Sequence, residues 1–323
     1  MQAACRRPLG RLPLPVSALG VGGGSLAMSA GPHDTQATLA ACWELGLRYF
    51  DTAPLYSQSE ERLGLFLESF DRDSFVMSTK VGRFPAPAGS RRFDFSRSAV
   101  ERSIIQSLAR LRTHVLDLVF LHDLAPGMLG GDFERSRDMV LEETVPYLSQ
   151  LKEQGIIRAI GLAQYDCAAA VALLSEAHFD CMMVAGGYTL LCQDALRNLL
   201  PLCHARGIGV LMASPFHTGL LVTGAVEGAR YNYDVASPEL LHRVQLVQQV
   251  CARHGVELPC AALQFPLLHP SVVAVVTGHQ TPAEVRANVA WLEAPIPMSF
   301  WEELINSELI PPMIPLSNAY PGH

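Results

Sequence analysis

The chain has 323 residues, of which 49% are hydrophobic and 17% are charged, so it is long and apolar enough to bury a large core. Its formal net charge of -7 argues against binding to nucleic acid or to an anionic membrane surface. Eight cysteines occur without a C-x-x-C pair, which favours free thiols in a reducing compartment and excludes the usual zinc-site spacings. We expect no metal.

The first 15 residues contain three arginines but no apolar stretch of the signal-peptide type. No apolar run of membrane-spanning length occurs elsewhere in the chain. We therefore expect a cytoplasmic protein without a membrane partner, a monomer or homodimer, that acts on a small molecule.

Short β-rich runs alternate with amphipathic helical stretches along the chain, a pattern typical of repeated βα units around a parallel sheet. We count eight units. The expected strands are Ala18–Gly22, Arg48–Asp51, Phe75–Lys80, Leu116–Leu121, Ile157–Leu162, Cys181–Val184, Gly209–Ala213 and Val272–Val276. The expected helices are Asp34–Leu45, Glu60–Ser69, Ser96–Leu111, Asp138–Gln154, Cys167–Glu176, Asp194–Arg206, Pro238–His254 and Pro282–Trp291, with a further short helix at Cys260–Leu268.

Eight units that reach the end of the chain predict a TIM (β/α)8 barrel, with residues 1–323 forming one domain. The segment Arg7–Pro13 is expected to form a hairpin that plugs the bottom of the barrel. The Pro-rich segment after Ala294 is expected to fold over the mouth, and the long loops Pro85–Asp94 and Leu124–Phe133 to shape a site there.

Local sequence signals indicate where several helices begin and end. Asp34 and Ser96 are the expected N-caps of two helices. Gly155, Gly207 and Gly255 follow expected helices and are typical C-terminal stops.

A doubly wound fold is the main alternative, because Gly20–Ser25 looks like a damaged G-x-G-x-x-G at a strand end. That fingerprint needs a helix directly after its last glycine, but Leu26–Pro32 intervenes here. No acidic residue follows in a strand about 20 residues later either. The barrel is therefore the favoured fold.

Three polar residues, Asp51, Lys80 and His122, close apolar runs that are expected to be buried parallel strands. The carboxyl ends of such strands meet at one mouth, where barrels carry their chemistry. Together with Tyr56, these groups suggest proton transfer coupled to hydride transfer. Taken singly, each has a structural alternative: a capping carboxylate, a packing tyrosine, a solvated lysine, and a hydrogen-bonded pair with Asp123.

The motifs around these residues resemble the signature of the aldo-keto reductases, in the same order and over nearly the whole chain. They are Asp51–Ser57, Ser78–Val81, Leu121–Asp123, Gly161–Tyr165, Ser214–Leu221, and Thr277-Gly278 followed by Asn288. Three further segments look most like the D-threo-aldose (L-fucose) dehydrogenases, with pyridoxal 4-dehydrogenases as close relatives. They are Ala185–Leu191, Ala262–Pro270 and Phe300–Trp301.

The resemblance implies catalytic roles for Asp51, Tyr56, Lys80 and His122. Tyr56 would exchange the proton, and the ammonium of Lys80 would favour its phenolate by lowering the pKa of the phenol. Asp51 would hold Lys80 in place, and His122 would hydrogen-bond the substrate oxygen.

The resemblance also implies a nicotinamide dinucleotide as cofactor, with an aromatic ring stacked on the nicotinamide and small residues around the pyrophosphate. The implied cofactor residues are Gly23, Gln164, Tyr188, Ser214, Phe216, Gly219, Leu220, Gly278, Gln280, Glu284 and Asn288. Gln164 stands where the family usually has Asn. Many relatives carry Arg or Lys near positions 278 to 284, whereas this chain has Glu284, which would repel a 2′-phosphate and therefore favours NAD over NADP.

Three functions remain open from the sequence. The first is oxidation of an aldose hemiacetal to the lactone, and the second is a carbonyl or pyridoxal-type oxidoreductase, which includes enzymes of specialised metabolism. The third is a non-catalytic cofactor-binding scaffold. Candidate substrate contacts are His33, Asp123, His217, Tyr231 and Tyr233.

Overall fold

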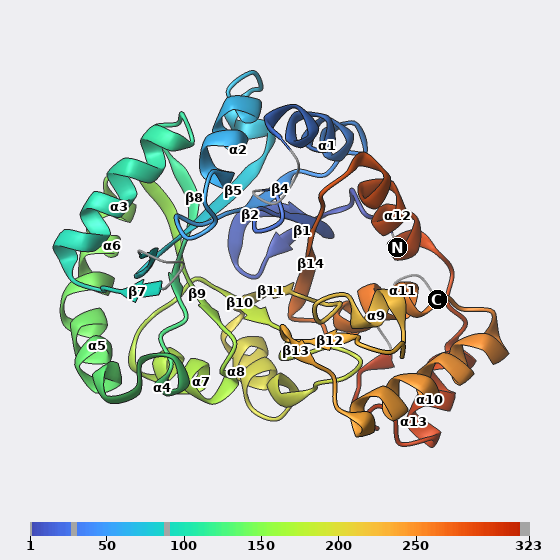
Figure 1. Cartoon of the computed structure of the whole chain (residues 1–323). Helices are drawn as coiled ribbons and strands as arrows, with labels where there is room; N and C mark the ends of the chain where they lie inside the picture. The colour runs from blue at the N-terminus through green and yellow to red at the C-terminus, as the bar shows by residue number, and fades with distance from the viewer. Residues whose placement is uncertain (1, 27–30, 87–90, 317–323) are drawn as a thin grey trace.

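Eight parallel strands close into a barrel surrounded by helices in the computed structural model, which describes residues 2–26, 31–86 and 91–316 (Figure 1). The order around the barrel is β10-β11-β14-β3-β4-β5-β8-β9, and β14 pairs with β3. The barrel strands are β3 Leu19–Gly22, β4 Tyr49–Asp51, β5 Val76–Val81, β8 Leu116–His122, β9 Ile157–Gln164, β10 Cys181–Ala185, β11 Gly209–Ala213 and β14 Val272–Gly278. The predicted barrel is confirmed.

The apolar runs of the strands serve two buried layers, because successive side chains of a strand point to opposite faces. Tyr49, Phe120 and Met183 belong to a cluster inside the barrel. Their neighbours Phe50 and Val119 belong to the larger cluster between the strands and the helices. Both faces are therefore covered, as the continuous hydrophobic runs predicted.

The predicted N-terminal hairpin is present as β1, Arg6–Leu9, paired antiparallel with β2, Leu12–Ser17. Leu9, Leu14 and Val16 join the cluster inside the barrel. The hairpin therefore closes the end of the barrel opposite to the mouth.

All the expected helices are present in the outer layer. Together with those that were not expected, the helices of the described residues are α1 Pro32–Glu44, α2 Ser59–Leu67, α3 Arg97–Arg110, α4 Pro126–Leu129, α5 Phe133–Met139, α6 Val145–Glu153, α7 Cys167–Glu176, α8 Leu199–Arg206, α9 Leu220–Thr223, α10 Pro238–His254, α11 Leu258–Gln264, α12 Pro282–Glu293 and α13 Met298–Asn306. The stretch predicted as one helix over 138–154 includes a π-helical turn, Val140–Thr144, between α5 and α6. Among the described residues, no helix is both long and apolar enough to cross a membrane.

Two predicted starts differ from the structure: the first helix is capped by Gly31 rather than Asp34, and the helix predicted from Asp194 begins as α8 only at Leu199, after a 3-10 turn at Asp194–Leu196. Proline is common at the first position of a helix, and the first helix begins at Pro32. Asp34 therefore lies within the first turn instead of capping it. The Oγ of Ser96 accepts a hydrogen bond from the backbone N–H of Ala99, as expected for an N-cap. Gly207 and Gly255 end α8 and α10 in the left-handed conformation.

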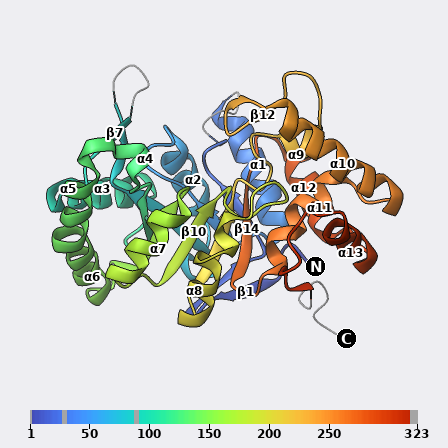
Figure 2. The same cartoon turned by 90° about the horizontal axis from the view of Figure 1, so that it is seen from below.

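The two predicted loops at the mouth contain short secondary structure. The first includes the antiparallel pair β6, Arg83–Pro85, and β7, Arg91–Phe93. The second includes α4 and a 3-10 turn at Gly130–Asp132. Figure 2 shows the β7 segment projecting at the end of the barrel opposite to β1.

The C-terminal segment does not cross the mouth within the described residues, so this expectation is wrong for the part up to residue 316. Helix α13 packs against α10 on the outside of the barrel, and Nη2 of Arg243 donates to the carbonyl of Leu309. Figure 2 shows the segment continuing toward the end that carries β1. Its apolar residues, including Trp301 and Ile310, are buried in the outer core, which determines this path.

Candidate active site

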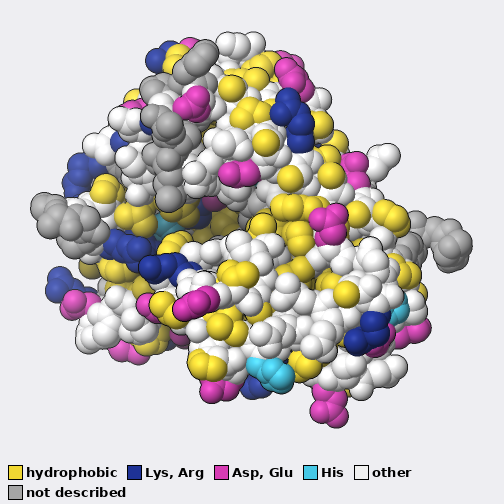
Figure 3. All heavy atoms as spheres, turned by 45° about the vertical axis from the view of Figure 1, so that its right-hand side comes forward, with side chains coloured by type: hydrophobic (Ala, Val, Ile, Leu, Met, Phe, Trp, Pro, Cys, Tyr) yellow, Lys and Arg dark blue, Asp and Glu magenta, His cyan; other side chains and the backbone are white. Residues whose placement is uncertain are grey.

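Three of the four predicted catalytic residues lie at the carboxyl ends of adjacent strands. Asp51 ends β4, Lys80 is the penultimate residue of β5, and His122 ends β8. Tyr56 lies in the turn between β4 and α2, and its ring meets that of His122 edge to face with centroids 6.0 Å apart. Figure 3 shows a hollow on this side of the molecule, with a histidine visible inside it and Lys or Arg side chains along its edge.

Lys80 and Asp51 form a buried ion pair at the base of the site. The Nζ of Lys80 lies 2.6 Å from Oδ2 of Asp51 and also donates to the carbonyl of Thr52 at 2.9 Å. The Oγ of Ser78 donates to the other carboxylate oxygen at 2.7 Å. Because each charge has partners of good geometry, the pair tolerates burial and its position is fixed.

Tyr56 lies above this pair, with the Nζ of Lys80 over its ring at 4.8 Å from the centroid. The pKa of Tyr56 is raised well above its ordinary value, first by burial and then by the carboxylates of Asp51 and Asp123. Arg83 acts in the opposite direction. The net shift is upward, opposite to the lowering expected from Lys80, because burial and the two carboxylates outweigh the effect of Arg83. The phenol stays protonated at neutral pH and can donate.

His122 is held neutral. Burial lowers its pKa well below the ordinary value, and the charges of Lys80, Arg83 and Arg91 lower it further. Its Nδ1 is buried and has no hydrogen-bond partner among the described residues. A neutral imidazole has one N–H donor and one acceptor, so His122 can bind a substrate oxygen without carrying a charge into the site.

A second buried ion pair, between Arg83 and Asp123, lies beside His122. Nη1 of Arg83 donates to Oδ2 of Asp123, and both side chains are almost completely buried. The same carboxylate oxygen is 3.7 Å from Nε2 of His122. Asp123 was an expected substrate contact, whereas Arg83 was missed. The sequence feature that could have identified Arg83 is its positive charge three residues after Lys80, at the point where the chain leaves β5.

Two of the predicted cofactor residues have a buried amide oxygen without a hydrogen-bond partner among the described residues. Gln164 uses its Nε2 to donate to the carbonyl of Leu124 at 3.0 Å. Nδ2 of Asn288 lies 3.0 Å from Nδ1 of His279. Unpaired buried acceptors are costly, and the nicotinamide carboxamide and the adenine amino group each carry N–H donors. The two amides therefore fit the two ends of a dinucleotide.

The predicted pyrophosphate loop has an unusual backbone. Four of its residues have positive φ angles, namely Ser214, His217, Thr218 and Gly219. Three of these are not glycine, and strained backbone of this kind occurs preferentially at functional sites. Consecutive N–H groups in such turns form concavities that bind anions. Phe216 is half-buried and Leu220 is buried, so both anchor the loop to the core.

Gly23 and Gly278 lie at the mouth ends of two neighbouring strands, where the chain is too closely packed for a side chain. A Cβ at Gly23 would lie 2.4 Å from Oγ of Ser59, and one at Gly278 would lie 2.0 Å from Oγ of Ser25. That serine oxygen is buried without a partner among the described residues. Any larger residue at either position would therefore have to displace a serine hydroxyl.

Glu284 has a local structural role in addition to its predicted one. Its Oε2 accepts a hydrogen bond from the backbone N–H of Gln280 at 2.8 Å, while its own N–H donates to the N-cap Thr281. This arrangement fixes the carboxylate at the start of α12. A fixed negative charge here is consistent with discrimination against a 2′-phosphate.

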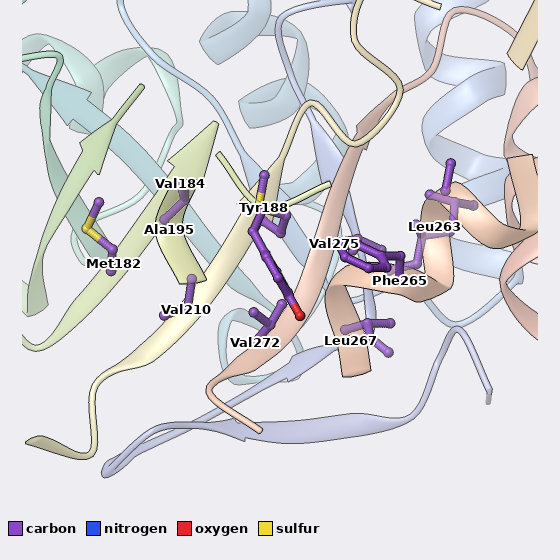
Figure 4. Close-up of a cluster of buried hydrophobic side chains, with 14 of the residues drawn as sticks. Met182, Val184, Tyr188, Ala195, Val210, Leu263, Phe265, Leu267, Val272 and Val275 are labelled. Carbon is purple, nitrogen blue, oxygen red and sulfur yellow. The ribbon is translucent and has the colours of Figure 1, made fainter. Parts of the chain in front are cut away.

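Tyr188 does not lie where it could stack on a nicotinamide, so this prediction is wrong. Its side chain is completely buried, with its ring 5.0 Å from that of Phe265. Figure 4 shows it between the barrel strands and the segment that carries Phe265 and Leu267. The sequence places Tyr188 after a strand but does not specify whether its side chain points to the mouth or to the outer core.

The barrel and the four converging side chains have the arrangement that the sequence predicted. Residues 18–307 match the profile of the Aldo/keto reductase family, and the chain belongs to that family of NAD(P)-dependent enzymes. It is 35% identical to a D-threo-aldose 1-dehydrogenase of Pseudomonas sp, over 92% of this chain and 96% of that protein. It is 32% identical to a pyridoxal 4-dehydrogenase of Microbacterium luteolum, over 96% of this chain and 99% of that protein.

Solved structures give the same result. The holo form of an aldo-keto reductase from Bacillus halodurans is similar with a TM-score of 0.78 and 26% sequence identity, over 94% of this chain and 95% of that chain. A putative aldo-keto reductase from Pseudomona aeruginosa is similar with a TM-score of 0.67 and 28% identity, over 90% of this chain and 96% of that chain.

Proposed function

We propose that this protein oxidises an aldose hemiacetal, of the D-threo type such as L-fucose, to the corresponding lactone with NAD as hydride acceptor. The observation that carries the proposal is the buried Lys80–Asp51 pair beneath Tyr56, with neutral His122 at the edge of the ring. The likeness to a D-threo-aldose 1-dehydrogenase supports the substrate class.

The chemistry assigns one task to each side chain. His122 donates a hydrogen bond to the anomeric oxygen and orients the reacting carbon. At alkaline pH the phenolate oxygen of Tyr56 would take the proton of the anomeric hydroxyl, and a bound nicotinamide would supply the acceptor for the hydride that leaves the anomeric carbon. A carbonyl forms at C1, giving the lactone. Lys80 and Asp51 hold the phenol in position throughout.

Support for NAD rather than NADP comes from the charge at the start of α12. Glu284 is exposed and negative, and Arg286 is the first cation after it in the chain. A carboxylate can accept a hydrogen bond from a free ribose hydroxyl, whereas it repels a phosphate. We therefore propose that NAD binds more tightly.

A spectrophotometric screen tests the proposal. The protein is mixed with NAD or NADP at alkaline pH and with L-fucose, D-arabinose, L-galactose or pyridoxal, and reduced cofactor is measured. We expect turnover with NAD and at least one of the three sugars. Turnover with pyridoxal alone, or none with any sugar, would contradict the proposed substrate class.

Reduction of a non-sugar aldehyde or ketone is the second candidate, and one observation favours it. The raised pKa of Tyr56 keeps the phenol protonated, as a proton donor in reduction must be. The direction of net turnover at neutral pH discriminates between the candidates. A cofactor-binding scaffold, the third possibility, would show no turnover in either direction.

A further inference from the structure

The ion pair between Arg83 and Asp123 lies beside the catalytic residues, and the proposed proton and hydride transfer does not use it. Nη1 of Arg83 donates to Oδ2 of Asp123, and both side chains are almost completely buried. A buried pair of this kind is often no more stabilising than apolar side chains of the same volume. Its place next to the reacting groups points to a role in binding.

Turns with positive φ angles direct both side chains to this place. Gly82 has a φ of 93° where the chain leaves β5, and a Cβ there would lie 2.0 Å from the ring of Phe95. Asp123, directly after β8, has a φ of 57°, which is uncommon outside glycine. Its N–H donates to the carbonyl of Ala163 at 2.9 Å. Such backbone occurs preferentially at functional sites, and here it fixes the carboxylate at the mouth end of the strand.

Arg83 is a positioning residue for Asp123. Its guanidinium lies over the ring of Phe93, 5.7 Å from the centroid, across the antiparallel pair of β6 and β7. Burial raises the pKa of Asp123, whereas the charges of Arg83 and Lys80 lower it. The guanidinium therefore favours the carboxylate form where little water can reach it. A carboxylate only accepts hydrogen bonds, so its partner in a substrate must be a donor.

The carboxylate lies next to His122 without bonding to it. Oδ2 of Asp123 is 3.7 Å from Nε2 of His122, which is too far for a hydrogen bond. The nearby negative charge favours the tautomer of the neutral imidazole that carries its proton on Nε2. His122 can then donate from Nε2 to the reacting oxygen of the substrate. Asp123 also raises the pKa of Tyr56, after burial and Asp51, so it lies within electrostatic reach of the phenol.

Two neighbouring oxygens of one substrate match these two groups. Oxygens on adjacent carbons of a sugar lie about as far apart as the two heavy atoms of a hydrogen bond. When His122 donates to the oxygen on the reacting carbon, the hydroxyl on the next carbon can reach Asp123. Oδ1 of Asp123 has no hydrogen-bond partner in the part of the chain that the structure describes. The carboxylate therefore has an acceptor available for that hydroxyl.

Two other expected substrate contacts are already engaged within the protein. Nε2 of His217 lies 2.6 Å from Oγ1 of Thr189, and Nδ1 lies 3.1 Å from Oδ1 of Asn232. The ring of His217 stacks on Tyr231 with centroids 4.5 Å apart. These contacts join the segments that follow β10 and β11. Asp123 is therefore the better candidate among them for binding a substrate hydroxyl.

We propose that Asp123, positioned by Arg83, accepts a hydrogen bond from the hydroxyl on the carbon next to the reacting carbon. The site then selects 2-hydroxyaldehydes and their cyclic hemiacetals over carbonyl compounds that lack this hydroxyl. A hydrogen bond to a charged group is strong enough to change kcat/KM by about tenfold or more. The inference rests on the proposed aldose oxidation for turnover, but binding of the hydroxyl can be measured without it.

The first experiment compares kcat/KM, with NAD, for D-arabinose and for 2-deoxy-D-ribose, which is the same sugar without its 2-hydroxyl. We expect a ratio of at least about tenfold in favour of D-arabinose in wild type. Asp123→Asn should lower the ratio severalfold, because a neutral amide is a weaker acceptor. Arg83→Met combined with Asp123→Leu replaces the pair by apolar side chains and should lower it further. Both sugars meet the same preparation, so the ratio does not depend on the folded fraction.

Asp117→Asn is the matched control. Asp117 is also a buried, ion-paired carboxylate of β8, but it lies near the opposite end of the strand, where it pairs with Arg72 at 2.7 Å. This variant should keep the wild-type ratio even where its stability falls. A ratio unchanged by Asp123→Asn and by the double variant, or lowered as much by Asp117→Asn, would overturn the inference.

The second experiment needs no turnover. D-arabinono-1,4-lactone and 2-deoxy-D-ribono-1,4-lactone, which differ only in the 2-hydroxyl, are titrated into the NAD-bound enzyme, and saturation-transfer NMR gives their dissociation constants. We expect severalfold tighter binding of the hydroxylated lactone in wild type and Asp117→Asn, and equal binding in the double variant. Equal binding in wild type would refute the inference and leave the proposed oxidation standing. The expected preference without any aldose oxidation would refute the proposed function alone.

Discussion

The ammonium of Lys80 lies over the ring of Tyr56, 4.8 Å from its centroid, and is held there by the carboxylate of Asp51. A cation on the face of an aromatic ring is attracted to it, so the contact fixes the phenol as well as the lysine. The ion pair has side-chain exposures of 2% and 6%, so little solvent screens it. This buried unit is the physical basis of the proposed chemistry.

Removal of one partner from the ion pair should destabilise the protein strongly. Lys80→Met leaves the carboxylate of Asp51 buried without its cation, and such losses typically cost about 3 to 5 kcal/mol of the free energy of unfolding. Arg112→Met is the matched control, because Arg112 pairs with Glu68 at the surface and should cost about 1 kcal/mol or less. Urea unfolding of both variants measures the difference. Equal losses would contradict the assigned burial.

The pH dependence of turnover should differ between the two directions. Because the pKa of Tyr56 is raised, its phenolate becomes common only at strongly alkaline pH, so oxidation should speed up as pH rises. Reduction needs the protonated phenol and should hold steady from neutral pH upward until that pKa is reached. Profiles of kcat/KM in both directions check this. An oxidation rate that levels off near neutral pH would show instead that the pKa of Tyr56 is lowered.

Stability should fall in weak acid through buried histidines. Burial lowers the pKa of His279 from 6.5 to about 4. Between these values the unfolded chain binds more protons than the folded one, so stability is fully present above pH 6.5 and is lost as pH falls toward 4. The loss is roughly 3 kcal/mol for a shift of this size. The urea midpoints of wild type and His279→Gln should converge as the pH falls through this range. A difference between the two midpoints that stays constant with pH would contradict the lowered pKa of His279.

Cofactor preference should depend on the charge of Glu284. Glu284→Gln keeps an acceptor for the N–H of Gln280 but removes the negative charge. We expect the ratio of the NADP and NAD dissociation constants to fall by about tenfold, measured by quenching of protein fluorescence. Glu302→Gln, an exposed change on α13, should leave the ratio unchanged. A wild-type protein that binds NADP at least as tightly as NAD would contradict this interpretation.

The strands and the positions of three candidate catalytic residues could be predicted because one physical signal specifies both. A buried parallel strand needs an apolar run, and a polar residue at its end marks the mouth. Asp51, Lys80 and His122 satisfy this rule and lie together in the structure. Arg83 does not follow an apolar run directly, so its partnership with Asp123 depended on tertiary structure that the sequence pattern does not encode.

Side-chain direction beyond the strand ends was not predictable. Tyr188 lies only a few residues from the end of β10, but the turn between them sends its ring into the outer core. The tail likewise follows its buried residues, such as Ile310, onto α10 rather than over the mouth. The direction of the pKa shift of Tyr56 could not be predicted from the sequence either, because it depends on burial of the phenol and on the carboxylates of Asp51 and Asp123.

The most direct test of the central claim is single-turnover kinetics of Tyr56→Phe with saturating cofactor and a substrate identified by the screen. The substitution removes the hydroxyl that exchanges the proton and changes the volume little, so the dissociation constant of the cofactor should match that of wild type. We predict a rate of hydride transfer lower by about 10² to 10⁴-fold. Hydride transfer at the wild-type rate in this variant would show that Tyr56 is not the proton-exchanging group.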